Sequence, residues 1–407
     1  MQIKENIVTL EARKSFDFFW QEANTDPDSP GYGLIRDNTE PGMEAMASIA
    51  SVGFGLSAIV IAVERGWISH TQGAERTLGT LKTFRDHVEQ YHGFFYHFID
   101  MDTGKKYGDT YDCPSIIDTA IFINGAITSG IYFGGEILAI ANVLYEQIEW
   151  PLYYDASRNV FFMGYSPETG GFGQWDMYAE QLMMYLLAVG SPTYPISPKV
   201  YDGFERKKVS YGEAQFYTSP GNALFTHQYS HAWFDFSQYL DKDGIDWAEN
   251  SRIATLAQRQ YAIDEERFKT FHEKSWGLSA CSGPYGYRVY GAAPFAAETD
   301  GALNDGTVAP TAASGSIVFT PFESIEVMHY LYQEQPNVWG KYGFKDAYNL
   351  DVEPPFYAES VIGIDKGITL LMIENYLHGT IWQLYMDYPP IQQATQSLGF
   401  VPKEVKR

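Results

Sequence analysis

The stretch from Gly170 to Pro192 constrains the fold most, because a glycine-rich turn runs there into a long apolar segment. Apolar residues recur at helical spacing from Tyr178 to Val189 and predict a buried helix. Asp176 occupies an N-cap position, and Gly190 to Pro192 form a typical helix end. Glu180 then lies in the first turns of this helix, where a buried carboxylate is costly without a partner, a ligand or a raised pKa.

Two aromatic residues, Trp175 and Tyr178, flank Glu180 in the sequence. An aromatic surround raises the pKa of a carboxyl group, and such an acid can protonate the leaving group of a glycoside. The alternative is that Glu180 pairs with an arginine or caps a neighbouring helix. The spacing alone favours neither interpretation.

Two further acids lie at the starts of apolar helices. Asp118 follows the start of the predicted helix from Ser115 to Phe133, and Asp365 begins the predicted helix from Asp365 to His378. If all inner helices present their N-termini to one face, these acids and Glu180 converge there. Alternatively, Asp118 lies three residues after Ser115 and completes a capping box, with aspartate in place of glutamate.

Composition and charge narrow the classes of partner. Aromatic residues make up 16% of the 407 residues and charged residues only 19%, which suits a large core and stacking on pyranose rings. The net charge is −23, with no basic run before the short tail from Lys403 to Arg407, so nucleic acids and polyanionic sugars are poor candidates. The longest apolar run, Ile49 to Val63, is too short to span a bilayer. A neutral sugar is the expected partner, with no membrane and no nucleic acid.

The expected domain organisation and compartment rest on sequence features that we do not find. No repeat, linker or low-complexity segment divides residues 1–407, so we expect a single domain and a monomer. Cys113 and Cys281 are expected to be reduced thiols. No signal peptide is evident at the N-terminus, which predicts a cytoplasmic protein, or a periplasmic or secreted one if a leader has been removed.

The sequence gives little support for a metal site. His227 and His231 are four residues apart and share one face of a helix, but no adjacent glutamate or nearby cysteine supports a metal. Binding of a ligand and a buried structural role both remain open for them. The loop from Glu298 to Thr311 offers Asp300, Asn304 and Asp305, yet lacks the bidentate glutamate of a calcium loop. We therefore expect no metal and no other cofactor.

Arg36 and Asp37 end a short extended piece within the long loop from Asn24 to Ala47. Long ordered loops are commonly functional, which makes both residues candidates for substrate binding. A local salt bridge between them is the alternative.

Many strings along the chain resemble those of the bacterial glucoamylase-like domain, which the endo-β-1,2-glucanase family shares with cyclic β-1,2-glucan synthases. They include GLIRD, SIIDTAIF, YAEQLMMYLLAVGSPTYP, HQYSHAWFDF, DGTVAPTAA, WGKYGFKDAYN and GIDKGITLLMIENY, in order and through nearly the whole chain. The resemblance implies an all-α fold, an (α/α)6 barrel with short β-hairpins and long loops on the cleft face. It also implies action on β-1,2-linked glucose without a metal.

The family's central glutamate lies in a Tyr-Asn-Glu-Ala motif, which corresponds to Glu180 here. Ala179 replaces the asparagine of that motif, and Gln181 replaces its alanine. The family's aspartates correspond to Asp118 and Asp365, and either can be the base. The residues predicted to bind the sugar are Arg36, Asp37, Trp175, Tyr178, His227, Gln228, Tyr229, His231, Trp233, Trp276, Asp305 and Glu374.

The expected activity is hydrolysis of β-1,2-glucan or its oligosaccharides, with Glu180 as general acid and an aspartate that activates water. If the carboxyls lie roughly 6.5 to 9.5 Å apart, or farther with a sugar hydroxyl between them, the anomer is inverted, and we expect inversion. Transglycosylation of the same glucan is one alternative. Epimerisation by histidine bases and non-catalytic glucan binding are the others.

Overall fold

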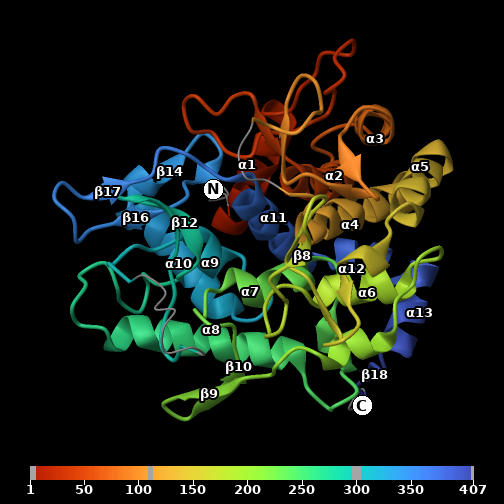
Figure 1. Ribbon diagram of the computed structural model, residues 1–407. Coiled ribbons are helices and arrows are strands. Elements are labelled where there is room, and N and C mark those ends of the chain that lie inside the picture. The colour runs from red at the N-terminus through yellow and green to blue at the C-terminus, as the bar shows by residue number, and fades with distance from the viewer. Residues whose placement is uncertain (1–5, 109–112, 296–303, 405–407) are drawn as a thin grey trace. The chain divides into compact units, whose positions relative to one another are not determined.

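The computed structural model describes residues 6–108, 113–295 and 304–404 (Figure 1). The chain divides into two compact units. Unit 1 comprises the described residues up to Asp17, Met177–Glu180 and Glu205–His378, and unit 2 comprises Phe18–Asp176, Gln181–Phe204 and the described residues from Gly379 onward. Helix α1, Ile7–Gln21, begins in unit 1 and ends in unit 2.

Unit 2 is built on apolar helices that lie side by side. Its helices are α2 (Ile49–Glu64), α3 (His70–Asp86), α4 (Ile116–Phe133), α5 (Gly135–Glu146), α6 (Leu182–Gly190), α12 (Thr380–Met386) and α13 (Pro389–Ser397), with 3-10 turns at Trp150–Tyr153 and Pro198–Asp202. Helix α4 packs on α2 and on α5, and α6 packs on α13 (Figure 1).

Small residues let α2 and α4 approach closely. A Cβ atom on Gly125 would lie 1.9 Å from the carbonyl oxygen of Gly53, so neither position has room for a side chain. Helix α4 is long and apolar enough to cross a membrane by length and composition alone, but 78% of that window is buried inside the structure, as in the core helix of a globular unit.

Short antiparallel strand pairs connect the helices of unit 2. The strands are β1 (Met46–Ser48), β2 (Gln90–Tyr91), β3 (Phe94–Phe95), β4 (Phe98–Asp100), β5 (Tyr154–Asp155), β6 (Val160–Phe161), β7 (Gly164–Ser166), β8 (Gly170–Phe172) and β18 (Val401–Pro402). Strand β1 pairs with β4, and β2, β5 and β7 each pair with the following strand.

Unit 1 has fewer long helices and more irregular chain. Its helices are α7 (Phe225–Gln228), α8 (Trp247–Asp264), α9 (Pro310–Ser314), α10 (Pro321–Glu334) and α11 (Gly363–Leu377), with 3-10 turns η3 (Tyr229–Ala232), η4 (Phe236–Gln238) and η5 (Pro336–Val338). Helix α9 packs on α10 and on α11, and α11 also contacts η3.

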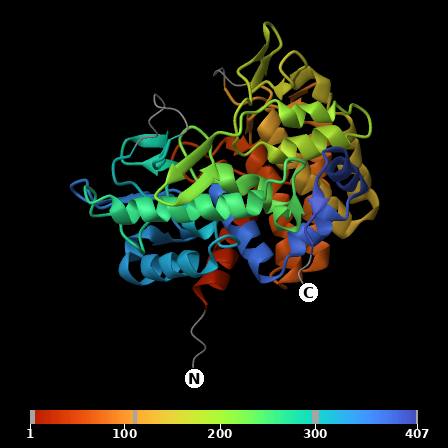
Figure 2. The ribbon, with the colours of Figure 1, turned by 90° about the horizontal axis from the view of Figure 1, so that it is seen from below.

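The strands of unit 1 are equally short. They are β9 (Lys208–Tyr211), β10 (Ala214–Tyr217), β11 (Tyr239–Leu240), β12 (Ala280–Gly283), β13 (Gly286–Val289), β14 (Trp339–Gly340), β15 (Gly343–Phe344), β16 (Tyr348–Asn349) and β17 (Phe356–Tyr357). The pair β9–β10 lies along α8, where Phe216 packs against Ala254 and Ala257 (Figure 2).

Several predictions of local structure are confirmed. The predicted helix from Ser115 to Phe133 is present as α4, and Ser115 is its N-cap. Cys113 and Cys281 are free thiols. The described chain is rich in helix, as predicted, while its arrangement as a barrel and its organisation as a single domain stay predictions.

Candidate active site

Asp365 lies in the first turn of α11, and only 5% of it is exposed. A helix N-terminus favours a negative charge, because its first N–H groups have no partner within the helix. The N-cap residue Ile362 makes no side-chain cap. Thr311 Oγ1, on α9, donates to the backbone carbonyl of Asp365 at 3.1 Å and thereby holds the start of α11. The structure therefore places Asp365 at a helix start, as the sequence predicted.

A second aspartate, not singled out from the sequence, lies beside Asp365. Asp346, between β15 and β16, is 4% exposed, and its side chain is within hydrogen-bonding reach of the Asp365 side chain. Asp346 Oδ2 accepts from Ser282 N at 2.5 Å. Burial raises the pKa of the Asp346 carboxyl, and the contacts with Asp365 and Ser282 oppose that rise. Asp346 occurs in the WGKYGFKDAYN string, but nothing in its spacing signals that it meets Asp365.

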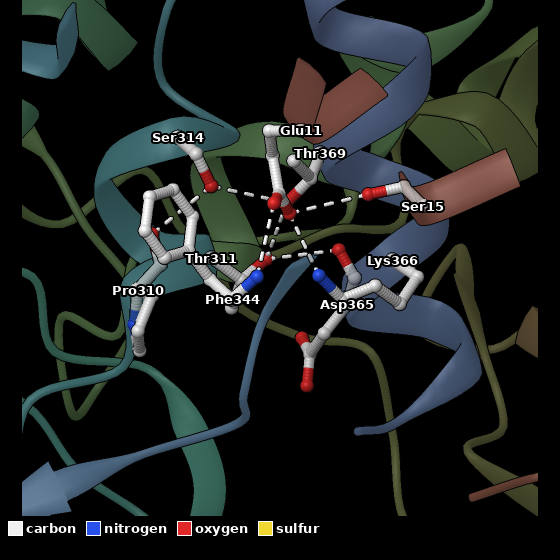
Figure 3. A network of polar contacts seen from close by, with 9 residues as sticks. All are labelled: Glu11, Ser15, Pro310, Thr311, Ser314, Phe344, Asp365, Lys366 and Thr369. Carbon is white, nitrogen blue, oxygen red and sulfur yellow. Dashed lines mark hydrogen bonds and ion pairs between the residues drawn. The ribbon is translucent and has the colours of Figure 1, made fainter. Parts of the chain in front are cut away.

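A buried carboxylate from α1 ties together the two segments that carry these aspartates (Figure 3). Glu11 accepts from Lys366 Nζ at 2.7 Å, from Phe344 N at 2.9 Å and from Ser15 Oγ at 3.2 Å. Burial raises the pKa of Glu11, and the nearby Lys366 charge opposes that rise. Figure 3 shows the carboxyl of Asp365 pointing away from this network.

The same segment needs glycine at position 343. Its φ is +84°, and a Cβ atom there would lie 2.0 Å from Glu11 Oε2. Glycine therefore permits both the left-handed backbone conformation and the close approach of the carboxylate.

A small cavity adjoins this network, and its lining includes Thr311, Ser314, Asp346, Asp365 and Thr369. Its volume is about 10 Å³, which is room for about one water molecule. A pyranose ring is far larger, so this cavity does not bind the sugar.

Glu180 lies in a turn and is partly exposed. Its backbone carbonyl accepts from Ser230 Oγ, on η3, at 2.5 Å, which anchors the turn within unit 1. Glu180 and Asp365 thus belong to the same unit, whereas Asp118 belongs to unit 2. The convergence of all three acids stays a prediction.

The predicted helix around Glu180 is wrong at its N-terminal end. Helix α6 begins at Leu182, and Asp176 is not its N-cap but pairs with Arg158 at 2.9 Å. The physical reason lies in the preceding backbone. Met177 forms a parallel bridge with Glu205, and Tyr178 N donates to the Glu205 carbonyl at 3.1 Å, so this segment is extended rather than helical.

In unit 2, Asp118 lies in the first turn of α4 and contacts the N-cap residue Ser115. Ser115 Oγ donates to Asp118 Oδ2 at 2.5 Å, while Asp118 N donates to Ser115 Oγ at 3.3 Å. His97 Nε2 lies 3.6 Å from Asp118 Oδ1. Ser115 is therefore the N-cap of α4, but the capping box is incomplete, because Ser115 N donates to the Phe95 carbonyl and not to the Asp118 carboxylate. His97 is a neighbour that the sequence did not single out.

Asp37 is partly buried near this group. Burial raises the pKa of its carboxyl, Asn38 and the nearby His97 oppose the rise, and the negative charge of Asp118 adds to it. Asn38 Nδ2 donates to Asp37 Oδ2 at 2.9 Å. The local salt bridge between Arg36 and Asp37 is not formed, because Arg36 pairs with Glu22 at 3.0 Å instead. Asp37 and Asp118 are thus two neighbouring carboxyls in unit 2.

Both histidines of the HQYSHAW segment are interior residues of unit 1. His227 Nε2 lies 3.4 Å from Asn222 Oδ1, and His231 Nε2 lies 3.2 Å from Ser251 Oγ. Burial lowers the pKa of each to about 3, so both rings are neutral at pH 7. Of the alternatives that the sequence left open, the buried structural role fits this geometry. Within residues 6–108, 113–295 and 304–404, no group of three His, Cys, Asp or Glu side chains is arranged to hold a metal ion.

Most aromatic and amide candidates for sugar binding are core residues. Tyr178 stacks on Trp247 with ring centroids 4.6 Å apart, and Gln228 Nε2 donates to the Ala312 carbonyl and to Ser316 Oγ at 2.8 Å each. The candidates that are at most 3% exposed are Tyr178, His227, Gln228, His231, Trp233 and Trp276, and Tyr229 and Trp175 are nearly as buried. These side chains are therefore largely covered by protein in the structure, and their role in sugar binding stays a prediction.

The structure also shows the surroundings of Asp305 and Glu374, two acidic residues that were predicted to bind the sugar. Asp305 Oδ1 accepts from Thr307 N at 3.0 Å and from Thr307 Oγ1 at 2.6 Å, which closes a tight turn. Glu374 is buried in α11, nine residues after Asp365, which is about 13 Å along the axis at 1.5 Å per residue. Glu374 therefore does not join Asp365 at the helix start. Asp300, from the same loop as Asp305, lies outside the described residues.

Comparison with known proteins gives matches over nearly the whole chain. A family model named Glycoamylase, described as "Putative glucoamylase", matches residues 173–389. A crystal structure of a protein described in the same words, from Bacteroides uniformis, is 32% identical with a TM-score of 0.87, and 97% of each chain is covered. An endo-β-1,2-glucanase from Chitinophaga pinensis, solved with sophorotriose and glucose, is 27% identical with a TM-score of 0.87, covering 97% of this chain and 98% of that one.

One curated relative has a named exo activity. It is an exo β-1,2-glucooligosaccharide sophorohydrolase (non-reducing end) from Parabacteroides distasonis, 27% identical over 432 residues. The alignment covers 97% of this chain but only 58% of that relative.

Proposed function

The chain belongs to the Glycoamylase family, and from this premise we propose that it is a glycoside hydrolase that cleaves β-1,2-glucan or β-1,2-gluco-oligosaccharides. The observation that carries the proposal is the match of almost the entire chain to an endo-β-1,2-glucanase that was solved with sophorotriose. The strongly negative net charge agrees with a neutral sugar as substrate. We further propose that the helices form an (α/α)6 barrel and that the protein acts as a monomer.

Glu180 is the proposed general acid, and Asp365 the proposed base. A general acid must reach the glycosidic oxygen, and Glu180 is partly exposed in a turn anchored by Ser230. Asp365 shares a unit with Glu180 and lies at a helix start without a local cap. Asp118 is a weaker candidate, because its carboxylate already accepts from Ser115 and faces His97.

The test is turnover of β-1,2-glucan and of its oligosaccharides by the wild type and by Glu180→Gln. The amide keeps the shape of the side chain but cannot donate the required proton, so the rate should fall by about two to four orders of magnitude. Glu205→Gln is the matched control, because Glu205 has an exposed side chain and should leave the rate unchanged. Near-normal turnover by Glu180→Gln with an unchanged melting curve would exclude Glu180 as the acid.

The first product fixes the stereochemistry and the reaction class. Proton NMR should show the α-anomer first if water attacks with inversion, and the β-anomer would require a covalent intermediate. An added acceptor sugar should not change the products of a hydrolase, whereas a transglycosylase would elongate it. Cleavage of starch without cleavage of β-1,2-glucan would refute the proposed substrate.

A further inference from the structure

Two carboxyl groups lie side by side at the start of α11. Asp346 and Asp365 are 4% and 5% exposed, and their side chains are within hydrogen-bonding reach of each other. An ionised carboxylate only accepts hydrogen bonds, so two carboxylates in contact repel, and a bond between them requires a proton on one. Asp346 Oδ1 is buried, and no donor from the described part of the chain reaches it. A proton held by the pair would supply that missing donor.

The charges around the pair favour such a proton. Lys366 is the cation that faces Asp346, but its Nζ already bonds to the Glu11 carboxylate at 2.7 Å. Asp305 and the Cys281 thiol also face this region, and the combined negative charge of Asp346, Asp365 and Asp305 raises the pKa of Cys281, after burial as the main cause. The pair therefore lies among more carboxylates than Lys366 alone can neutralise.

The surrounding structure also prevents the two carboxyls from moving apart. Glu11 binds Phe344 N, two residues before Asp346, and Lys366 Nζ, one residue after Asp365. Ser282 N holds the other oxygen of Asp346 at 2.5 Å. The spacing of the carboxyls is thus set by contacts outside the pair.

We propose that Asp346 and Asp365 hold one proton between them, and that Asp346 is a positioning residue that sets the protonation state of Asp365. This proposal rests on the proposed function. In the hydrolytic step, an O–H bond of water breaks and its proton passes to the pair through Asp365, while the water oxygen bonds to the anomeric carbon. The glycosidic C–O bond breaks, and its oxygen takes the proton of Glu180. The pair then holds two protons, one of which returns through solvent to Glu180, so that only water is consumed.

The direct test is infrared difference spectroscopy on the whole protein at neutral pH, which detects a protonated carboxyl without any substrate. Asp346→Asn and Asp365→Asn should each abolish the same protonated-carboxyl band, because each leaves a single carboxylate. Asp305→Asn is the control and should keep the band, because Asp305 is not part of the pair. Persistence of the band in both pair variants, or its absence from the wild type, would overturn the proposal.

The pH profile of kcat/KM adds a readout that a purely structural role would not move. Asp346→Asn keeps an N–H donor beside Asp365, so its acidic limb should stay near that of the wild type, with turnover within about tenfold. Asp346→Ala removes the donor and should move the acidic limb upward by about one pH unit or more, because a buried carboxylate without a donor binds its proton more tightly. An acidic limb at the same pH in the wild type, in Asp346→Asn and in Asp346→Ala would contradict the proposal.

Different results would refute the proposed function and the proposed shared proton. A wild type that shows the shared band but cleaves no β-1,2-glucan would refute the function and leave the shared proton intact. A wild type that cleaves the glucan but lacks the band would refute the shared proton alone.

Discussion

Helices α4 and α11 both carry an aspartate in the first turn, and the two aspartates are held in different ways. Asp118 of α4 is fixed by Ser115, three residues earlier, in a closed local cap. Asp365 of α11 has no side-chain cap and instead meets Asp346, which is itself held by Ser282. A carboxylate that bonds to its own helix start stabilises that helix. The protonation state of a carboxylate held by distant segments depends instead on the groups those segments place beside it. The contrast indicates a structural role for Asp118 and a chemical one for Asp365.

The largest expected difference is in activity. Asp365→Asn should lower kcat by about two to four orders of magnitude, because an amide cannot accept the proton of water. Asp118→Asn should lower kcat by about tenfold or less, because its main contact is the cap of α4. The measurement is turnover of β-1,2-gluco-oligosaccharides by both variants at equal fractions of folded protein. A larger loss for Asp118→Asn would reverse the assignment of the base.

The second difference concerns stability. Glu11→Gln leaves the buried charge of Lys366 without its partner and should cost about 3 to 5 kcal/mol in the free energy of unfolding. Glu22→Gln is the matched control, because its pair with Arg36 is partly exposed and Glu44 remains 4.0 Å from that guanidinium. Its expected cost is about 1 kcal/mol or less. Urea unfolding curves measure both, and equal costs would mean that burial does not distinguish the two pairs.

The two helix starts also show how far sequence reasoning reaches. Asp118 follows Ser115 by three residues, which is a local pattern, and the structure confirms Ser115 as the N-cap of α4 although the reciprocal bond of a capping box is not formed. The helix at Asp365 was also predicted, because its apolar residues follow the helical period. Its partners were not, because Asp346, Ser282 and Glu11 are distant in sequence and meet only through tertiary contacts.

The prediction of the helix start near Glu180 was wrong for the same reason, because tertiary contacts decide the backbone conformation there. The apolar run from Tyr178 satisfies the helical period, but the backbone of Met177 and Tyr178 pairs with Glu205, so the helix starts later. Trp233 and Trp276 were predicted to bind sugar, and the structure shows that both are fully buried, so their contact with sugar stays a prediction. The sequence alone shows which residues suit a sugar, but burial depends on what the remainder of the chain places over them.

The smallest expected difference is in how the free energy of unfolding depends on pH. Asp37 and Glu11 are the two carboxyls to compare. Burial raises the pKa of both carboxyls, but Glu11 has Lys366 beside it, whereas Asp37 has the Asn38 amide and lies near the negative charge of Asp118. A carboxyl whose pKa is raised on folding binds its proton more tightly in the folded state than in the unfolded one. Its contribution to stability is therefore fully present below the unfolded pKa of about 4 and is lost as the pH rises through the folded value.

Asp37→Asn removes this titration, so the variant should gain stability relative to the wild type as the pH rises above about 4. The gain is at most about 1.4 kcal/mol per pH unit, because a single proton is involved. Urea unfolding of both proteins between acidic and neutral pH measures the difference, and Asp118→Asn should reduce the slope in part by removing a repelling charge. Parallel stability curves for wild type and Asp37→Asn would mean that Asp37 titrates alike in the folded and unfolded states. In that case the proximity of Asp118 would carry no energetic cost in unit 2, and like charges would matter only beside the start of α11.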